Sequence, residues 1–132
     1  MYKVVIDTNV LIFSIHNPSG TPAEIIQLVL CEEIQLYYSK GIINEYKKVL
    51  ARPKHKLTIE EQNLFISDIL DVGIMITPKT SNIDMRDEKD RIFYDTARES
   101  NAILITGDKD LLVLQEPFIM QPHEFLEYFR KL

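Results

Sequence analysis

Short segments rich in valine, isoleucine and leucine alternate along this chain with longer segments of helical periodicity. The strand-like segments are residues 2–6, 34–38, 73–77, 102–106 and 118–120. The helix-like segments are residues 21–32, 41–51, 58–72, 88–99, 110–114 and the tail from Pro122. Strands that alternate with helices form parallel βαβ units, in which helices cover both faces of the sheet. The pattern therefore predicts an α/β fold, a three-layer α/β/α sandwich around a parallel sheet of about five strands.

Several of the expected helices carry capping signals at their ends. Thr21 is expected to be an N-cap, with Pro22 as the first helical residue. Thr58 and Glu61 have the spacing of a capping box, and Gly73 is expected to end the helix that they begin. The polar stretch 77–86 is expected to be a surface loop, so we interpret residues 1–132 as a single domain.

Composition excludes several classes of protein. The single cysteine excludes an intramolecular disulfide framework and a cysteine-rich zinc module. No apolar run approaches the ~20 residues of a membrane span, and Asp7 and Asn9 are incompatible with a signal peptide. We therefore expect a soluble, cytoplasmic protein without a membrane partner. With 15 Lys+Arg against 20 Asp+Glu, the chain does not bind nucleic acid by overall charge alone.

Four acidic residues occupy positions that could converge. Asp7 and Asp108 each follow a predicted strand, and ligand sites in parallel sheets form beyond the carboxyl ends of strands. Asp90 has the helical spacing that continues an apolar, inward-facing stripe, and Glu45 flanks the apolar side of its helix. A buried carboxylate without a partner is costly, so inward-facing acids require an explanation.

Each of these acids also has a purely structural interpretation. Asp90 could be a first-turn acid behind an Asp87 cap, and Glu45 could pair with a lysine of its own helix. Asp108 could cap the short helix that follows it, and Asp7 could cap a turn. Convergence of all four would instead indicate an oxygen-ligand site for Mg²⁺ or Mn²⁺, of the kind that serves phosphoryl chemistry.

Three segments carry a family resemblance: VVIDTNVLI, SKGIINEYKKVLARPK and DEKDRIFYDTARESNAILITGDKDLL. Their order and spacing resemble the motifs of PIN domain ribonucleases, in the branch of toxins from toxin–antitoxin pairs that is VapC-like in a broad sense. The resemblance implies a PIN-like fold and four catalytic acids, Asp7, Glu45, Asp90 and Asp108. It implies that Asp7, Asp90 and Asp108 hold Mg²⁺ or Mn²⁺, and that Thr8, Asn9 and Thr106 support them.

Other residues of the motifs have less defined roles. Asp87 is interpreted as a cap or an outer group of the site, and Asp110 as a residue that shapes its turn. Arg91 departs from the pattern, since the family commonly has asparagine there. Beside Asp90, a basic side chain could contact phosphate or weaken metal binding.

The implied reaction is metal-dependent hydrolysis of RNA phosphodiester bonds, and the implied partners are RNA, a cognate antitoxin and a second copy in a homodimer. In an acidic protein the RNA-binding surface must be local, and we expect it at Lys47, Arg52, Lys54 and Lys56.

Two other functions stay open. A haloacid-dehalogenase-like phosphatase also begins with an Asp after its first strand, although Asn9 stands where that family has a second Asp. The chain could also be a non-catalytic module that binds RNA or protein.

Overall fold

The computed structural model describes residues 1–131. In chain order the elements are β1 (Lys3–Ile6), α1 (Thr8–His16), α2 (Thr21–Leu30), β2 (Gln35–Tyr38), α3 (Lys40–Leu50), η1 (Pro53–His55) and α4 (Ile59–Val72). They continue with β3 (Ile74–Met75), η2 (Glu88–Asp90), α5 (Arg91–Ser100), β4 (Ile103–Ile105), α6 (Lys109–Leu112), β5 (Ile119–Met120) and α7 (Pro122–Arg130). Within residues 1–131, no helix is long and apolar enough to cross a membrane.

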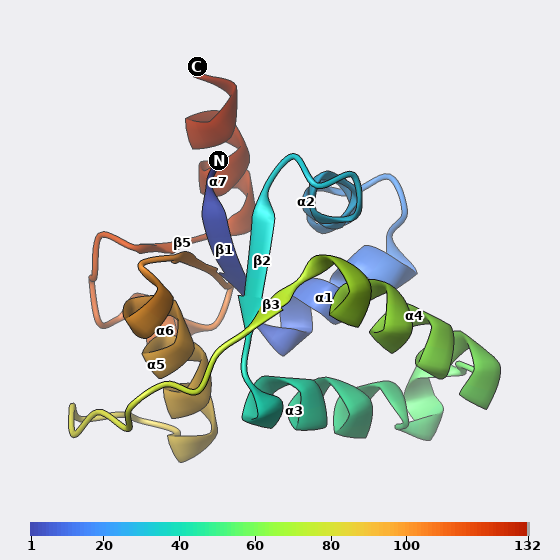
Figure 1. Cartoon of the computed structure of the whole chain (residues 1–132), viewed down its shortest axis with the longest axis horizontal. Helices are drawn as coiled ribbons and strands as arrows, with labels where there is room; N and C mark the ends of the chain where they lie inside the picture. The colour runs from blue at the N-terminus through green and yellow to red at the C-terminus, as the bar shows by residue number, and fades with distance from the viewer. Residues whose placement is uncertain (132) are drawn as a thin grey trace.

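The five strands form one parallel sheet in the order β3-β2-β1-β4-β5. Helices α1, α2 and α4 lie on one side of β1 and β2, and α5 and α6 lie on the other (Figure 1). The central strand β1 is the most completely buried, since Val4, Val5 and Ile6 are inaccessible to solvent. The three-layer α/β/α prediction is confirmed, and the apolar segments expected to be central are β1 and its neighbour β4.

Strand order places the sheet's switch point between β1 and β4. The chain extends from β1 through β2 to β3 on one side, and then returns to place β4 on the other side of β1. The carboxyl ends of β1 and β2 point toward α3 (Figure 1). Beyond β1 the backbone N–H of Asp7 donates to the carbonyl of Ile105, 3.0 Å away, so the ends of β1 and β4 stay side by side. Such a switch point is where parallel sheets bind ligands.

Two predicted boundaries were wrong at the start of the chain. Residues 8–16, for which we predicted no helix, form α1, and its buried residues do not fall on one narrow face, so amphipathic periodicity is weak. The N-cap of α2 is Gly20 and not Thr21, which is already inside the helix with Pro22. The capping box of Thr58 and Glu61 is confirmed.

The segment after α4 also differs from prediction. Only Ile74–Met75 form a strand, at the edge of the sheet, where a strand of residues 73–77 was predicted. Gly73 ends α4 in an ordinary extended conformation, with φ −89°. Close packing, and not backbone conformation, requires a glycine at position 73, because a Cβ there would lie 2.4 Å from Cε2 of Tyr38. Residues 77–86 form a loop, as predicted.

Candidate functional site

A hollow of about 170 Å³ opens at the carboxyl edge of the sheet. All four acids predicted from the sequence line it: Asp7, Glu45, Asp90 and Asp108. They come from the end of β1, from α3, from the start of α5 and from the turn after β4. A larger hollow of about 420 Å³ lies beside α1 and α2, but Glu24 is the only charged side chain that lines it, so it offers no comparable set of ligands.

Thr106 ties two of the acids together. Asp7 is only 5% exposed, and its Oδ2 accepts a hydrogen bond of 2.6 Å from the hydroxyl of Thr106. The same hydroxyl accepts the backbone N–H of Asp108 at 2.9 Å. Thr106 is itself fully buried; its bond to Asp7 is buried, and its bond to the Asp108 N–H is partly buried. Thr106, which was expected to support the metal site, therefore lies between Asp7 and Asp108.

Tyr46 fixes the helix that carries Glu45. Its side chain is completely buried, and its hydroxyl donates to the carbonyl of Ile6, the residue before Asp7. Glu45 is thereby held at the hollow and is half-buried. No ion pair of Glu45 occurs among residues 1–131, so pairing with a lysine of α3 does not account for it. Sequence analysis missed Tyr46, because nothing in the sequence relates position 46 to β1.

Asp90 is the least satisfied group of the site. It is 7% exposed, and its Oδ2 has no hydrogen-bond partner among the described residues. Asp87 caps this turn, as the structural interpretation of Asp90 supposed: its Oδ1 accepts the N–H of Lys89 at 3.1 Å, and Asp90 lies in the first turn behind it. That position leaves Oδ2 of Asp90 without a partner, so it does not account for the burial of this carboxylate. Burial, and then the negative charges of Asp108 and Asp7, raise the pKa of Asp90 to about 7.

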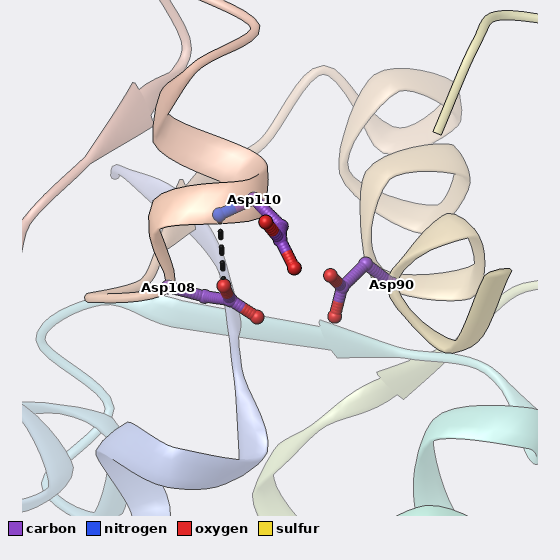
Figure 2. Close-up of side chains that lie close together, drawn as sticks. All are labelled: Asp90, Asp108 and Asp110. Carbon is purple, nitrogen blue, oxygen red and sulfur yellow. Dashed lines mark hydrogen bonds between the residues drawn. The ribbon is translucent and has the colours of Figure 1, made fainter. Parts of the chain in front are cut away.

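Asp110 belongs to the cluster as well. Carboxylate oxygens of Asp90, Asp108 and Asp110 lie within 4.8 Å of one another, as Figure 2 shows. The N–H of Asp110 donates to Oδ1 of Asp108 at 2.9 Å, so the capping interpretation of Asp108 is also correct. Asp110 was expected only to shape this turn, and its spacing two residues after Asp108 was the available signal.

Burial and mutual repulsion disfavour the ionised forms of the carboxyl groups of Asp7 and Asp90. Burial raises the pKa of Asp7; the Thr106 hydrogen bond works against this, while the charges of Asp108 and Glu45 add to it. A donor set made only of carboxylate and hydroxyl oxygens suits Mg²⁺ or Mn²⁺. A divalent ion would also neutralise the repulsion and give Asp90 Oδ2 a partner, so the residues present fit such an ion.

The supporting polar groups expected from the resemblance lie nearby. Thr8 and Asn9 line the hollow at the start of α1. Thr8 is buried and its Oγ1 has no hydrogen-bond partner among the described residues, whereas Asn9 is exposed.

Basic residues lie at the rim. Of the predicted RNA-binding residues only Arg52 lines the hollow; Lys47 is in the last turn of α3, and Lys54 and Lys56 belong to η1 and its C-cap. Lys89 also lines the hollow, and sequence analysis missed it. Its place between two acids of the motif was the available signal.

Comparisons with known proteins identify the family and the fold of the chain. A family model described as a PIN domain matches residues 3–110. An uncharacterized protein of Methanocaldococcus jannaschii is 36% identical to the chain, and the match covers 98% of this chain and 92% of that protein. The crystal structure of VapBC2 from Rickettsia felis, bound to a DNA fragment from their promoter, is similar with a TM-score of 0.57.

That structural match covers 90% of this chain and 96% of the other at 16% identity, so it concerns the fold alone. The family model spans all four acids of the hollow. The resemblance found in the sequence is confirmed, and the chain belongs to the PIN domain family.

Proposed function

We propose that this protein is a ribonuclease that hydrolyses RNA phosphodiester bonds with the help of Mg²⁺ or Mn²⁺. The observation that carries the proposal is the buried carboxylate of Asp90, which has an unpartnered oxygen and faces acids from distant segments of the chain. In this proposal residues 1–132 act as one catalytic domain.

Each side chain has a defined task. Asp7, Asp90 and Asp108 would hold the ion, with Asp110 beside them, and Glu45 would orient the attacking water. When bound, the ion supplies positive charge that polarises the phosphate and favours an ionised water. Thr106 keeps Asp7 and Asp108 at a fixed spacing through its two hydrogen bonds. Thr8 and Asn9 would offer further polar contacts at the mouth of the hollow.

Basic side chains would position the RNA. Arg52 and Lys89 line the hollow and are exposed, so they are suited to contact the phosphate being cut or its neighbours. Lys47, Lys54 and Lys56 continue the basic surface along α3 and η1, where they would bind the RNA backbone further from the acids.

We further propose that the protein is the toxin of a toxin–antitoxin pair and acts in the cytoplasm, as a homodimer that a cognate antitoxin inhibits. The likeness to the VapBC2 structure supports the antitoxin partner, whereas the homodimer and the cytoplasmic location rest on expectations from the sequence. Induced expression should arrest growth, and the Asp7→Asn variant should not.

Cleavage of labelled RNA by the purified protein tests the reaction. Wild-type protein should cut RNA with Mg²⁺ or Mn²⁺ and stop when EDTA is added, and Asp7→Asn should be inactive. Asparagine keeps an oxygen that can accept from Thr106, so the variant should remain folded, as circular dichroism can verify. Full activity of Asp7→Asn would overturn the assignment of the site.

The same samples separate the alternatives. Hydrolysis of p-nitrophenyl phosphate without RNA cleavage would favour a phosphatase. Metal binding in calorimetry with no turnover of any RNA would favour a non-catalytic binding module.

A further inference from the structure

The loop of residues 77–86 is held in place by few polar contacts. It contains no helix or strand, and within residues 1–131 its backbone makes no hydrogen bond to other backbone groups. All hydrogen bonds of this loop go to Arg91 or Asp95. Its one ion pair joins Arg86 to Asp110 of the acidic cluster, at 3.6 Å. Besides the packing of Ile83 and Met85 against the core and the Arg86–Asp110 pair, the position of the loop therefore depends on α5.

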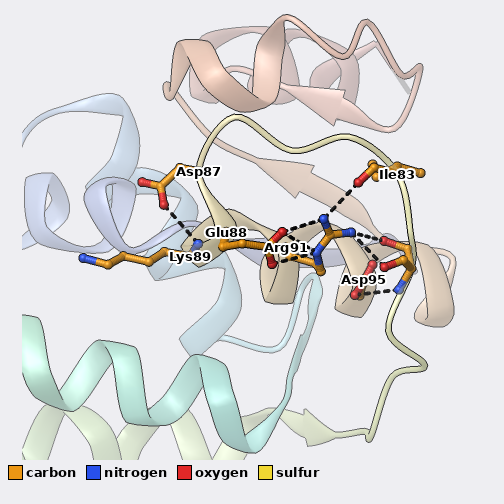
Figure 3. Close-up of polar contacts among 7 residues, drawn as sticks. Ile83, Asp87, Glu88, Lys89, Arg91 and Asp95 are labelled. Carbon is orange, nitrogen blue, oxygen red and sulfur yellow. Dashed lines mark hydrogen bonds and ion pairs between the residues drawn. The ribbon is translucent and has the colours of Figure 1, made fainter.

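Arg91 supplies most of these contacts (Figure 3). Its Nη1 donates to the carbonyl of Ser81 at 2.8 Å and to the Ser81 hydroxyl at 3.1 Å, and its Nη2 donates to the carbonyl of Ile83 at 2.9 Å. The same guanidinium pairs with Glu88, with Nη2–Oε1 at 2.7 Å and Nε–Oε2 at 2.9 Å. The Arg91 side chain is only 15% exposed, so it is committed to this network and does not line the acidic hollow.

Asp95 completes the attachment one helical turn further on. It is 5% exposed, and its Oδ2 accepts the backbone N–H of Ser81 at 3.1 Å. The charge of Asp95 also contributes to raising the pKa of Arg91, behind the larger effect of the Glu88 hydrogen bonds. The backbone of Ser81 is thus bound twice: its carbonyl accepts from Arg91, and its N–H donates to Asp95.

The network is continuous with the acidic hollow. The loop leads directly into η2. Glu88, the ion-pair partner of Arg91, is the first residue of η2 and lies between Asp87 and Asp90. Asp90 faces the repulsion of Asp108 and Asp7 without a hydrogen bond to its Oδ2. The Asp87 cap binds the N–H of Lys89 but gives Oδ2 of Asp90 no partner, so contacts beyond this cap also bear on how the segment presents Asp90.

We propose that Arg91 is a positioning residue for the acidic site: its contacts with residues 81–83 and Glu88 fix the segment that presents Asp90 to a bound divalent ion. The inference deepens the proposed function and rests on its metal site. A planar guanidinium can bind several acceptors in fixed directions, which a lysine ammonium cannot reproduce.

Mn²⁺ titration of the purified, metal-free chain by calorimetry tests this role without any RNA. The variants are Arg91→Met, which keeps the aliphatic stem, and Arg91→Lys, which keeps the charge. Thr58→Ala, at the capping box of α4, is the control for lost stability away from the site. Circular dichroism verifies that each variant is folded at the temperature of the titration.

Both Arg91 variants should bind Mn²⁺ ~10-fold more weakly or worse, as when an outer contact of a metal ligand is lost. Thr58→Ala should keep the wild-type affinity. The direction of the Arg91→Met change is decisive, because removal of a positive charge alone would strengthen cation binding. Arg91→Lys covers the case in which Arg91→Met does not fold.

Wild-type affinity in both Arg91 variants, or an equal loss in Thr58→Ala, would overturn the inference. If wild-type protein binds Mn²⁺ but cuts no RNA, the proposed reaction is wrong, and the affinities still decide the role of Arg91. Wild-type protein that binds no Mn²⁺ would overturn both.

Discussion

Glu61 and Asp90 are both carboxylates at the start of a helix, but their surroundings differ completely. Glu61 is exposed; its Oε1 accepts the N–H of Thr58 at 2.9 Å, and its own N–H donates to the Thr58 hydroxyl at 3.0 Å. The hydrogen bond from the Thr58 N–H to the carboxylate, and after it the Thr58 side chain, lower the pKa of Glu61. Asp90 is buried, lacks a partner for Oδ2, and has its pKa raised to about 7 by burial and by neighbouring acids.

The contrast separates an acid that supports the fold from one that burdens it. Ionised Glu61 is stabilised by groups within its own helical turn, whereas ionised Asp90 is opposed by residues brought from distant parts of the chain. A folded protein keeps such a costly carboxylate when a ligand compensates it, and strongly perturbed groups of this kind concentrate at functional sites.

Replacement of Asp90 by asparagine should give the largest effect. Cleavage of RNA should fall ~10³-fold or more, because a ligand of the ion is lost. Without metal, the same variant should be more stable than wild type at neutral pH by ~1–3 kcal/mol, because a penalised charge is removed. Urea unfolding and a cleavage assay measure the two effects. A variant that is both active and less stable would break the comparison.

The metal-free protein should lose stability as the pH rises. The pKa of Asp90 is higher in the folded than in the unfolded state, and the pKa of Asp7 is shifted in the same direction. The folded state therefore binds more protons than the unfolded state between about pH 4 and about pH 7. The corresponding stability is fully present below about pH 4 and is lost as the pH rises to about 7.

Unfolding free energies measured with EDTA at several pH values test this. Saturating Mn²⁺ should remove the decline, because the ion replaces the protons on the carboxylates. A metal-free protein whose stability rises over this range would contradict the electrostatic account of the hollow.

The Thr106→Val variant should have an intermediate effect. Valine keeps the volume but removes the donor to Asp7 and the acceptor for the N–H of Asp108, which should lower stability by ~1–3 kcal/mol. Metal affinity should fall as well, because the two ligands lose their common anchor. Thr106→Ser, which retains the hydroxyl, is the matched control and should stay close to wild type in both measurements.

The smallest effect is expected at the capping box that Thr58 forms with Glu61. Thr58→Ala removes a helix cap and should lower the free energy of unfolding by about 1 kcal/mol. RNA cleavage should be unchanged when the variant is assayed well below its melting temperature. A loss of cleavage in folded Thr58→Ala would mean that α4 affects the acidic site.

Local signals explain which features the sequence predicts. The capping box needs only two residues three positions apart, and the apolar runs of β1 and β4 reflect burial on both faces. The helix α1 escaped prediction because its buried residues do not follow one narrow stripe. A strand was predicted at residues 73–77, but the short length of β3 could not be foreseen. Pairing with Tyr37 and Tyr38, and not the sequence of β3, defines that length.

The site shows the same division. Asp7, Glu45, Asp90 and Asp108 were selected by their positions relative to strands and helix faces, and they share one hollow. Of the side chains that hold them, Thr106 was implied by the family resemblance, but Tyr46 was not predicted, because it binds the carbonyl of Ile6, forty positions away. Asp95 illustrates the limit: helix spacing places it off the face of Asp90, yet it is buried, because it binds the backbone of a loop.

The strand order has a consequence for how this hollow comes into being during synthesis. β1 emerges early, yet its neighbour β4 and the acids of its turn lie in the last third of the chain. Domains complete their folding only after the segments that pair have left the ribosome. A nascent chain that ends before β4 lacks Asp108 and the partner strand that aligns Asp7. Any activity that needs the assembled acids is thus withheld until β4 and the turn after it have been synthesised.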